Sequence, residues 1–421
     1  VDEEHDQSFK QYDRCPYNGR DVAIKKAQLK EVPILLGSAT PSMENYYLFS
    51  KEKDQRNYFS LRQRAGRGDF PELVLKDVKG KFTEIDSTWP LLEETLLEIK
   101  NKLDKKEQVL VFINKLGYSQ YVQCRNCGHQ FFNENCGCQN NLRYFKKKNC
   151  LSCSHCEFVM PLPEQCPECG SIKLLNKGFG TERVQQVLSE VFKDYTVERF
   201  DRDEIKNTRE LEDKLSRFHN AEIDIFVGTQ MLAKGHNFKN VNLVVVLGID
   251  SMLNYSDFRS SEKTYQLVEQ ISGRAGRYKP GARVIIQTMT PDHDVFKHLV
   301  NHSFNEFYEH ELPMRELCEC PPFSKIIMIF FSSSKREKLI NEVNSVASKI
   351  RVLMGENFKD VRLLGPAPMG IEKKASQFTW AIMLKSQDVT QLHQCAQTIE
   401  NNYHPSSQVS YKIDVDPFQM L

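Results

Sequence analysis

Short apolar runs alternate with amphipathic segments along much of the chain. Strands are predicted over 109–113, 196–200, 223–227 and 241–247. The run at 241–247 is apolar on both faces, as in a strand buried inside a parallel sheet. Residues 178–192 predict a helix with a one-sided apolar stripe, and 208–219 predict a charged helix. Because strands that alternate with helices are typical of parallel sheets, this region indicates an α/β domain.

The pattern differs toward both ends of the chain. Residues 34–36 predict a short buried strand that runs into a loop with helix-capping residues and then a helix over 43–49. After a further predicted strand at 283–288, Pro313, Pro321 and Pro322 indicate a boundary. The elements predicted beyond it are a strand, a helix and a strand, over 326–331, 335–353 and 380–384. They predict a small α+β domain at the end of the chain.

Composition narrows the class of protein. The chain has 421 residues, enough for two to four domains at roughly 100–200 residues each. Its longest apolar runs are far shorter than the ~18 residues of a membrane span. No basic segment followed by an apolar one marks a secretory signal, so we expect a soluble cytoplasmic protein. The net charge of +1 carries no signature of nucleic-acid binding, so such a partner requires local patches.

Nine of the 13 cysteines crowd one segment, which favours metal ligands over a disulfide framework. Two pairs have the Cys-x2-Cys spacing of a zinc knuckle, and a glycine follows each pair, as the tight turn around a metal requires. These pairs are Cys124 with Cys127 and Cys166 with Cys169. Together they predict one four-thiolate zinc site. A site closed in this way has no free coordination position, which indicates a structural rather than a catalytic role.

Two further segments carry candidate chemistry. The consecutive acids Asp2 and Glu3 follow Val1, which we interpret as the end of an apolar strand. Nucleotide hydrolysis uses one carboxylate to hold Mg²⁺ and a second to orient the attacking water. Arg274 and Arg277 are three residues apart, on one side of a helix or turn, and suit the charge of a transferring phosphoryl group. Alone, an acidic run is more often solvated surface, and a basic turn is more often simply exposed.

The order of these segments resembles a known family. Residues 2–5, 37–40, 228–236 and 270–277 are similar to motifs II, III, V and VI of superfamily-2 helicases, in that order. More narrowly, the chain resembles the PriA family of primosomal replication-restart helicases through residues 114–118, 178–182, 257–260 and 414–417. The resemblance covers essentially the whole chain. It implies an ATP-dependent 3′-to-5′ DNA helicase that recognises stalled or recombined forks and initiates primosome assembly.

The resemblance also implies a domain organisation. The expected fold is α/β: a RecA-like helicase lobe with a parallel sheet, an inserted zinc-binding module and a small α+β C-terminal domain. The expected parts are a remnant of helicase lobe 1 at 1–80, lobe 2 at 81–123 and 171–293, the zinc insertion at 124–170, and a DNA- and partner-binding domain at 294–421.

The sequence contains neither Gly-x4-Gly-Lys-Ser/Thr nor a shorter Gly-Lys-Thr. We therefore expect the chain to begin inside lobe 1, without the family's 3′-end-binding domain, and to be inactive alone. The rival hypothesis is a non-enzymatic, zinc-stapled DNA-binding scaffold.

Site residues follow from the resemblance residue by residue. In the intact enzyme Asp2 is expected to hold Mg²⁺, Glu3 to orient water, and Arg274 with Arg277 to stabilise the phosphoryl group. Residues expected to couple to the nucleotide are His5, Ser38, Thr40, Gln270 and Gly235. Residues expected to contact DNA are Thr229, Gln230 and Lys234, whose hydroxyl, amide and ammonium groups suit phosphate oxygens.

A second zinc ion is expected as well, but its ligands stay open. The family pattern requires a pair with two intervening residues, and this chain has Cys136-Gly137-Cys138 there. The second set is therefore Cys136, Cys138, Cys153 and Cys156, or else Cys138, Cys150, Cys153 and Cys156, with His155 as a further candidate.

Expected partners are forked and single-stranded DNA, single-strand DNA-binding protein, other primosome proteins and the replicative helicase, in a bacterial cytoplasm. We expect a monomer without membrane contact.

Overall fold

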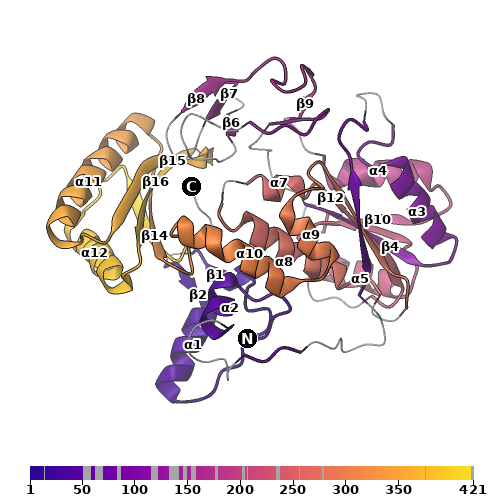
Figure 1. Cartoon of the computed structure of the whole chain (residues 1–421), viewed down its shortest axis with the longest axis horizontal. Helices are drawn as coiled ribbons and strands as arrows, with labels where there is room; N and C mark the ends of the chain where they lie inside the picture. The colour runs from indigo at the N-terminus through magenta and orange to yellow at the C-terminus, as the bar shows by residue number, and fades with distance from the viewer. Residues whose placement is uncertain are drawn as a thin grey trace.

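A computed structural model describes the chain except for residues 14, 51–57, 62–69, 83–86, 115–121, 132–141, 146–148, 153–157, 176–178, 202–203, 206, 234–237, 256, 277–278, 375 and 419–421. Two larger sheets dominate the described part. A six-stranded sheet lies on the right of Figure 1 and a four-stranded sheet on the left, with helix α10 (Phe304–Leu317) between them.

The six-stranded sheet is parallel throughout, in the order β10-β11-β4-β12-β13-β3. Its strands are β10 (Val197–Phe200), β11 (Ile225–Gly228), β4 (Gln108–Ile113), β12 (Val241–Leu247), β13 (Arg283–Thr288) and β3 (Glu72–Asp77). Apolar side chains of α3 (Glu93–Leu103) and α4 (Thr181–Val191) pack on one face. Those of α8 (Ser260–Ser272), α9 (Asp294–Val300) and α10 pack on the other, with Phe218 of α5 (Thr208–His219). A sheet covered on both faces confirms the predicted α/β class.

Local sequence accounts for many of the observed bounds. Helix α5 and strands β12 and β13 begin and end where the pattern predicts, and every residue of β12 is buried. Helix α5 starts where Asn207 accepts a hydrogen bond from the Glu210 amide (2.9 Å), and α1 (Gly19–Lys30) starts where Asn18 accepts one from the Arg20 amide (3.0 Å). Such side chains satisfy amides that have no partner within the helix.

The predicted strand at 34–36 is wrong. These residues form no strand, and Leu35 is 78% exposed. Within the described part of the chain, the residue that follows this segment, Gly37, forms an isolated β-bridge with Asp2. An apolar run becomes a buried strand only where a sheet covers it, and here the neighbouring residue pairs with a single residue of the N-terminal segment. The helix that follows, α2 (Met43–Ser50), forms as predicted.

The four-stranded sheet is antiparallel, in the order β15-β16-β14-β17. Its strands are β14 (Lys325–Ser333), β15 (Arg362–Lys374), β16 (Gln377–Ser386) and β17 (Ser410–Val415). Helices α11 (Arg336–Asn357) and α12 (Val389–Asn402) bury their apolar residues against it. This is the predicted small α+β domain.

The packing differs from the predicted boundary at 293/294. Helices α9 and α10 contribute Phe296, Phe307 and Tyr308 to the core under the parallel sheet. Pro313 lies inside α10 rather than between domains. Strand β3 likewise joins the parallel sheet, although the expected remnant of lobe 1 extends to residue 80. Large buried side chains keep these elements with the sheet, and such contacts between distant segments leave no local signal in the sequence.

The cysteine-rich segment forms two small sheets, one of β5 (Gln123–Cys124) with β9 (Leu174–Leu175) and one of β6 (Arg143–Phe145), β7 (Cys150–Ser152) and β8 (Val159–Pro161). The labels of β6, β7, β8 and β9 stand at the top of Figure 1. Val122, Phe131, Leu142 and Leu151 make a small buried cluster there. The segment therefore has some apolar core of its own.

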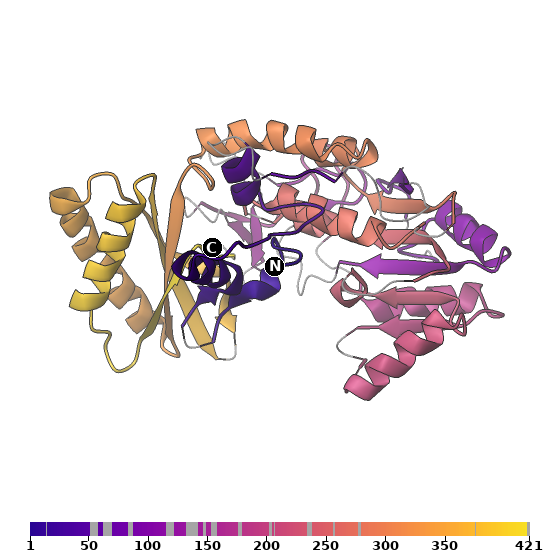
Figure 2. The same cartoon turned by 90° about the horizontal axis from the view of Figure 1, so that it is seen from below.

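The N-terminal segment contains η1 (Gln7–Phe9), β1 (Lys10–Gln11), β2 (Tyr17–Asn18), α1 and α2. In Figure 2 this segment, in indigo, lies between the C-terminal domain and the parallel-sheet domain. A buried ion pair makes the link: Lys10 Nζ lies 2.6 Å from Asp414 Oδ1, and it donates to the Val415 carbonyl at 2.6 Å. None of the described helices is both long enough and apolar enough to cross a membrane.

Candidate nucleotide-coupling site and metal centre

The acidic segment and the Ser38–Thr40 segment lie side by side. The Gly37 amide donates to the Val1 carbonyl (2.8 Å), and the Glu4 amide donates to the Gly37 carbonyl (3.1 Å). His5 Nδ1 shares a hydrogen bond with Ser38 Oγ at 2.7 Å, and it lies 3.6 Å from Glu3 Oε2. Ser38 Oγ in turn accepts from the Thr40 amide at 2.9 Å. The structure thus connects four predicted site residues, Glu3, His5, Ser38 and Thr40, in one chain of contacts.

Glu4 anchors this arrangement, and the sequence did not single it out. Its carboxylate is buried and accepts from the Ser42 amide (2.6 Å), Ser42 Oγ (3.1 Å) and Asn45 Nδ2 (2.5 Å). Arg20 neutralises its charge at 2.9 Å. A buried carboxylate with this many donors fixes the segment that carries it. The one signal was its place as the third consecutive acid, which did not distinguish it from Glu3.

The predicted arginines follow helix α8. The helix ends at Ser272, and the amides of Arg274 and Ala275 still donate to carbonyls of its last turn (2.9 and 3.0 Å). Arg274 is buried. The Gly276 amide donates to the Val241 carbonyl. The backbone of Gly276 has a φ of +70°, a conformation that favours glycine. Arg274 therefore lies in a turn fixed to α8. Gln270 lies in the last turns of α8, and Arg277 falls outside the described residues.

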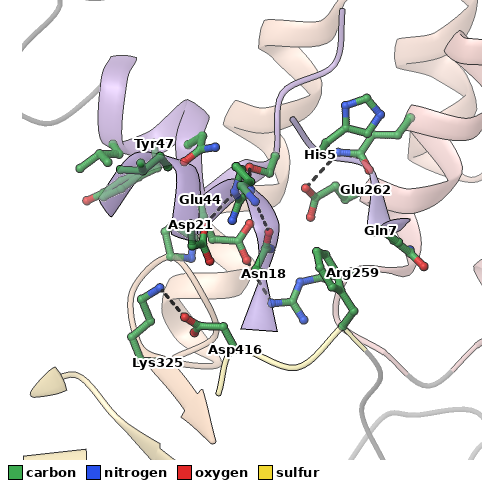
Figure 3. Close-up of a pocket in the computed structure, with 18 of the residues that line it drawn as sticks. His5, Gln7, Asn18, Asp21, Glu44, Tyr47, Arg259, Glu262, Lys325 and Asp416 are labelled. Atoms are coloured by element: carbon green, nitrogen blue, oxygen red, sulfur yellow. Dashed lines mark hydrogen bonds and ion pairs between the residues drawn. The ribbon is translucent and has the colours of Figure 1, made fainter. Parts of the chain in front are cut away.

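A pocket of about 520 Å³ opens between the N-terminal segment, α8 and the C-terminal domain (Figure 3). Its walls include His5, Glu44, Glu262, Lys325 and Asp416. Four of its cations are already paired: Arg20 with Glu4, Arg259 with Glu44 (3.1 Å), Lys263 with Asp257 (2.7 Å) and Lys325 with Asp416 (3.2 Å). Because the protein neutralises these four charges itself, they join parts of the protein and do not by themselves make a phosphate-binding site.

Two distant motifs of the sequence meet at this joint. Arg259 Nη1 donates to the Pro417 carbonyl (3.2 Å), and Lys263 Nζ donates to the Phe418 carbonyl (3.1 Å). The guanidinium of Arg259 also lies over the ring of Phe258, 4.2 Å from its centroid. The segments 257–260 and 414–417 therefore contact each other, and these contacts hold the start of α8 against the C-terminal segment.

Acid is expected to weaken this joint at Glu44. Burial by itself raises the pKa of Glu44, but Arg259 and Arg315 outweigh it and lower the pKa from 4.5 to about 2. A folded pKa below the unfolded one adds stability that is complete above the unfolded value and is lost as the pH falls toward the folded value. The difference in free energy of unfolding between wild type and Glu44→Gln should therefore shrink from pH 4.5 toward pH 2. Urea denaturation at stepped pH measures it, and a difference that stays constant over that range contradicts the assignment.

The predicted DNA contacts lie at the carboxyl end of strand β11. Thr229 follows the strand, and Gln230 begins α6 (Gln230–Ala233) with an exposed side chain. Gly228 is required there, because a Cβ would lie 2.4 Å from the Phe200 carbonyl oxygen. Loops at this edge of a parallel sheet commonly bind ligands. Lys234 and Gly235 fall outside the described residues.

The first predicted metal site is assembled. The sulfur atoms of Cys124, Cys127, Cys166 and Cys169 all lie within 4.8 Å of one another. Cys124 and Cys169 are 3.6 Å apart at Sγ, as are Cys127 and Cys166. Four thiolates around a tetrahedral zinc at ~2.3 Å are about 3.8 Å apart, so this geometry fits a metal ion. The glycines after the pairs, Gly128 and Gly170, have positive φ angles of 80° and 69°, as the tight turns require.

This metal centre is seated on the parallel-sheet domain. The Gly80 amide donates to the Arg125 carbonyl at 2.8 Å, and Gly128 packs against Lys79 and the Met289 carbonyl. The Arg125 guanidinium lies 5.6 Å from the centroid of the Trp89 ring. Since Lys79 and Met289 follow β3 and β13, the module rests on the carboxyl ends of those strands.

The second site stays a prediction. Cys150 is buried in strand β7. Cys136, Cys138, Cys153, Cys156 and His155 lie outside the described residues, so the two alternative ligand sets remain open.

Comparisons with known proteins agree with the motifs. A family model described as "Primosomal protein N C-terminal domain" matches residues 316–418, and one described as "Helicase conserved C-terminal domain" matches 176–279. "Replication restart protein PriA" of Synechocystis sp. is 34% identical over 427 residues, covering 100% of this chain and 50% of the relative. The protein of the same name from Bacillus subtilis is 34% identical over 425 residues, covering 100% and 52%.

Among solved structures, the helicase Lhr of Mycobacterium smegmatis bound to ssDNA and AMP-PNP is 13% identical with a TM-score of 0.36, covering 72% of this chain and 30% of Lhr. The chain spans about half the length of the two PriA relatives. Two family models, and alignments with replication restart proteins that cover the whole of this chain, agree with the motif order, and the chain belongs to the PriA family.

Proposed function

We propose that this chain is part of an ATP-dependent 3′-to-5′ DNA helicase that recognises stalled or recombined replication forks and initiates primosome assembly. The observation that carries the proposal is the contact of two predicted motifs with each other and with helix α8, which leads to the third motif. The acidic segment reaches Ser38 through His5, and the Thr40 carbonyl accepts from Gln266 of α8 at 3.4 Å. Helix α8 then leads to Arg274. This connection suits a motor in which nucleotide chemistry at one segment moves another.

Within this proposal each residue has a role. Asp2 holds Mg²⁺ and Glu3 orients the attacking water, while Arg274 and Arg277 stabilise the transferring phosphoryl group. His5, Ser38, Thr40, Gln270 and Gly235 transmit the nucleotide state. Thr229, Gln230 and Lys234 hold the backbone of the translocating strand.

The cysteine module binds zinc under this proposal and contributes to strand separation and primosome contacts. The partners are forked and single-stranded DNA, single-strand DNA-binding protein, other primosome proteins and the replicative helicase. The protein acts as a monomer in a bacterial cytoplasm.

One observation favours a second candidate function. The sequence lacks a Gly-Lys-Thr or Gly-Lys-Ser phosphate-binding loop, so this chain alone has no recognisable cradle for ATP. By itself it therefore suits a zinc-stapled DNA-binding scaffold.

ATP hydrolysis separates the two functions. We expect the purified chain to show no DNA-stimulated ATP hydrolysis, and full-length protein to show it and to lose it in Glu3→Gln. Phosphate release is measured with and without forked DNA. If the chain alone hydrolyses ATP and Glu3→Gln abolishes this activity, no separate phosphate-binding loop is needed. If full-length protein shows no turnover, the result supports the DNA-binding scaffold.

A further inference from the structure

Two carboxylates from distant parts of the chain hold the start of helix α2. Glu4 Oε1 accepts from the Ser42 amide at 2.6 Å, and Glu262 Oε1 accepts from the Met43 amide at 2.9 Å. Both contacts are buried. Amides at a helix start have no partner inside the helix, so each carboxylate satisfies a donor that burial would otherwise leave unpaired. One carboxylate belongs to the acidic segment and the other to α8.

Glu262 has a second partner that fixes its position. Its Oε2 atom lies 2.6 Å from Nη2 of Arg315 in helix α10. The side chains of Glu262 and Arg315 are 4% and 2% exposed, so water does not screen this pair. Nη1 of Arg315 also donates to the Pro321 carbonyl at 3.2 Å. A buried ion pair with further hydrogen bonds holds a single geometry.

Other contacts bring the same two helices onto the segment before α2. Gln266, one turn beyond Glu262, donates to the Thr40 carbonyl at 3.4 Å and to Glu262 Oε1 at 3.2 Å. The hydroxyl of Tyr308 in α10 donates to the Pro41 carbonyl. Residues 40–43 are therefore held by α8 and α10 on one side and by Glu4 on the other. Figure 3 shows Glu262 and His5 facing the same pocket.

Helix α8 transmits the position of Glu262 along its length. Tyr265, Val268 and Ile271 bury its inner face in the core. The backbone stays hydrogen-bonded through Arg274, whose amide donates to the Ile271 carbonyl. A continuous helix behaves as a rigid element, so displacing it at Glu262 also displaces Arg274.

We infer that Glu262 is a positioning residue, which sets the distance between Arg274 and the acidic segment by holding the Met43 amide from helix α8. This inference rests on the proposed ATP-hydrolysing function. Glu262 touches no reacting atom. It acts through Arg274, whose charge has to lie where the phosphoryl group forms, and a displacement of ~1 Å can reduce a rate about 100-fold.

Two double variants test the hydrogen bonds that residue 262 accepts, while the charge of the Glu262–Arg315 pair is absent from both. Glu262→Gln alone leaves Arg315 as a buried, unpaired charge, which destabilises the fold. Replacing both partners by uncharged groups of similar size is often neutral. We therefore compare Glu262→Gln/Arg315→Met with Glu262→Met/Arg315→Met, both in full-length protein. They differ in whether residue 262 can accept hydrogen bonds from the Met43 amide and from Gln266.

The Met/Met variant is expected to have a kcat for DNA-stimulated ATP hydrolysis about 10- to 100-fold below that of the Gln/Met variant. KM for ATP and affinity for forked DNA should be the same in both. Amide hydrogen exchange at Met43 should be faster in the Met/Met variant. Glu342→Gln is the control, because Glu342 accepts from Ser406 N (2.9 Å) in the C-terminal domain, far from α8 along the chain. Its kcat should equal that of wild type.

Equal kcat values in the two double variants overturn the inference. The inference is also overturned if thermal unfolding shows that the lower kcat comes from a larger fraction of unfolded protein. If wild-type protein itself shows no DNA-stimulated hydrolysis, the proposed function fails first and the inference fails with it.

Discussion

In full-length protein, Arg277→Ala is expected to lower the kcat of DNA-stimulated ATP hydrolysis about 10³-fold or more. The reason is electrostatic: charge spreads over the phosphoryl oxygens during transfer, and a guanidinium placed there stabilises the transition state more than the bound nucleotide. Affinity for forked DNA should be nearly unchanged, because this role involves no contact with the strand. Phosphate release and fork binding are measured on the same preparation.

Arg283→Ala is the matched control. Arg283 lies in the same domain and pairs with Glu72 (2.8 Å) and Glu98 (3.2 Å), partly in solvent. Surface pairs of this kind contribute little, so kcat should stay near wild type. An unaltered kcat in Arg277→Ala removes this residue from the phosphoryl role. A collapse of fork affinity instead assigns it to the DNA.

Removing the metal is expected to unfold the cysteine module while the parallel-sheet domain stays folded. Four thiolates on zinc supply roughly 10 kcal/mol or more of apparent binding free energy, which becomes folding free energy when the site forms only in the folded state. The module's own core is small, and Val122, Phe131, Leu142 and Leu151 cannot replace this contribution. Strands β4 and β12, by contrast, lie between two apolar layers.

Metal analysis and amide hydrogen exchange test this together. Cys169→Ser should lose one zinc per chain and expose the amides of β5 and β9, with the amides of β12 still protected. Cys318→Ser is the control, because Cys318 is exposed and lies outside the four-cysteine cluster. It should keep the full zinc content. Freshly purified, reduced protein with almost no zinc overturns the metal assignment.

The same analysis decides the ligands of the second site. Cys153→Ser should lose the other zinc, because Cys153 belongs to both alternative ligand sets. Cys150→Ser separates them: a loss of zinc places Cys150 in the set with Cys138, Cys153 and Cys156, and an unchanged content favours Cys136. If the chain binds only one zinc, the stretch from Cys136 to Cys138 supplies no ligand.

Local sequence patterns were sufficient to predict much of the structure of this protein. The apolar run of β12 and the charged helix α5 were predicted with their observed bounds, because the period of apolar and polar positions is set by adjacent residues. The first metal cluster was predicted for the same reason, since each Cys-x2-Cys turn is local and only the pairing of the two turns is not. The order of motifs was enough to indicate the family.

Contacts between residues far apart in the sequence could not be predicted from those patterns. The pairing of Lys10 with Asp414 and of Glu262 with Met43, and the burial of Glu4 in place of its neighbour Glu3, depend on how whole segments pack. The failed strand at 34–36 has the same origin, because an apolar run reveals its preference for burial but not whether a sheet lies beside it. Hydrophobic periodicity is a property of adjacent residues. The partner of a buried charge depends on the tertiary structure, because burial removes water from the charged group and leaves an unpaired carboxylate or ammonium costly in free energy.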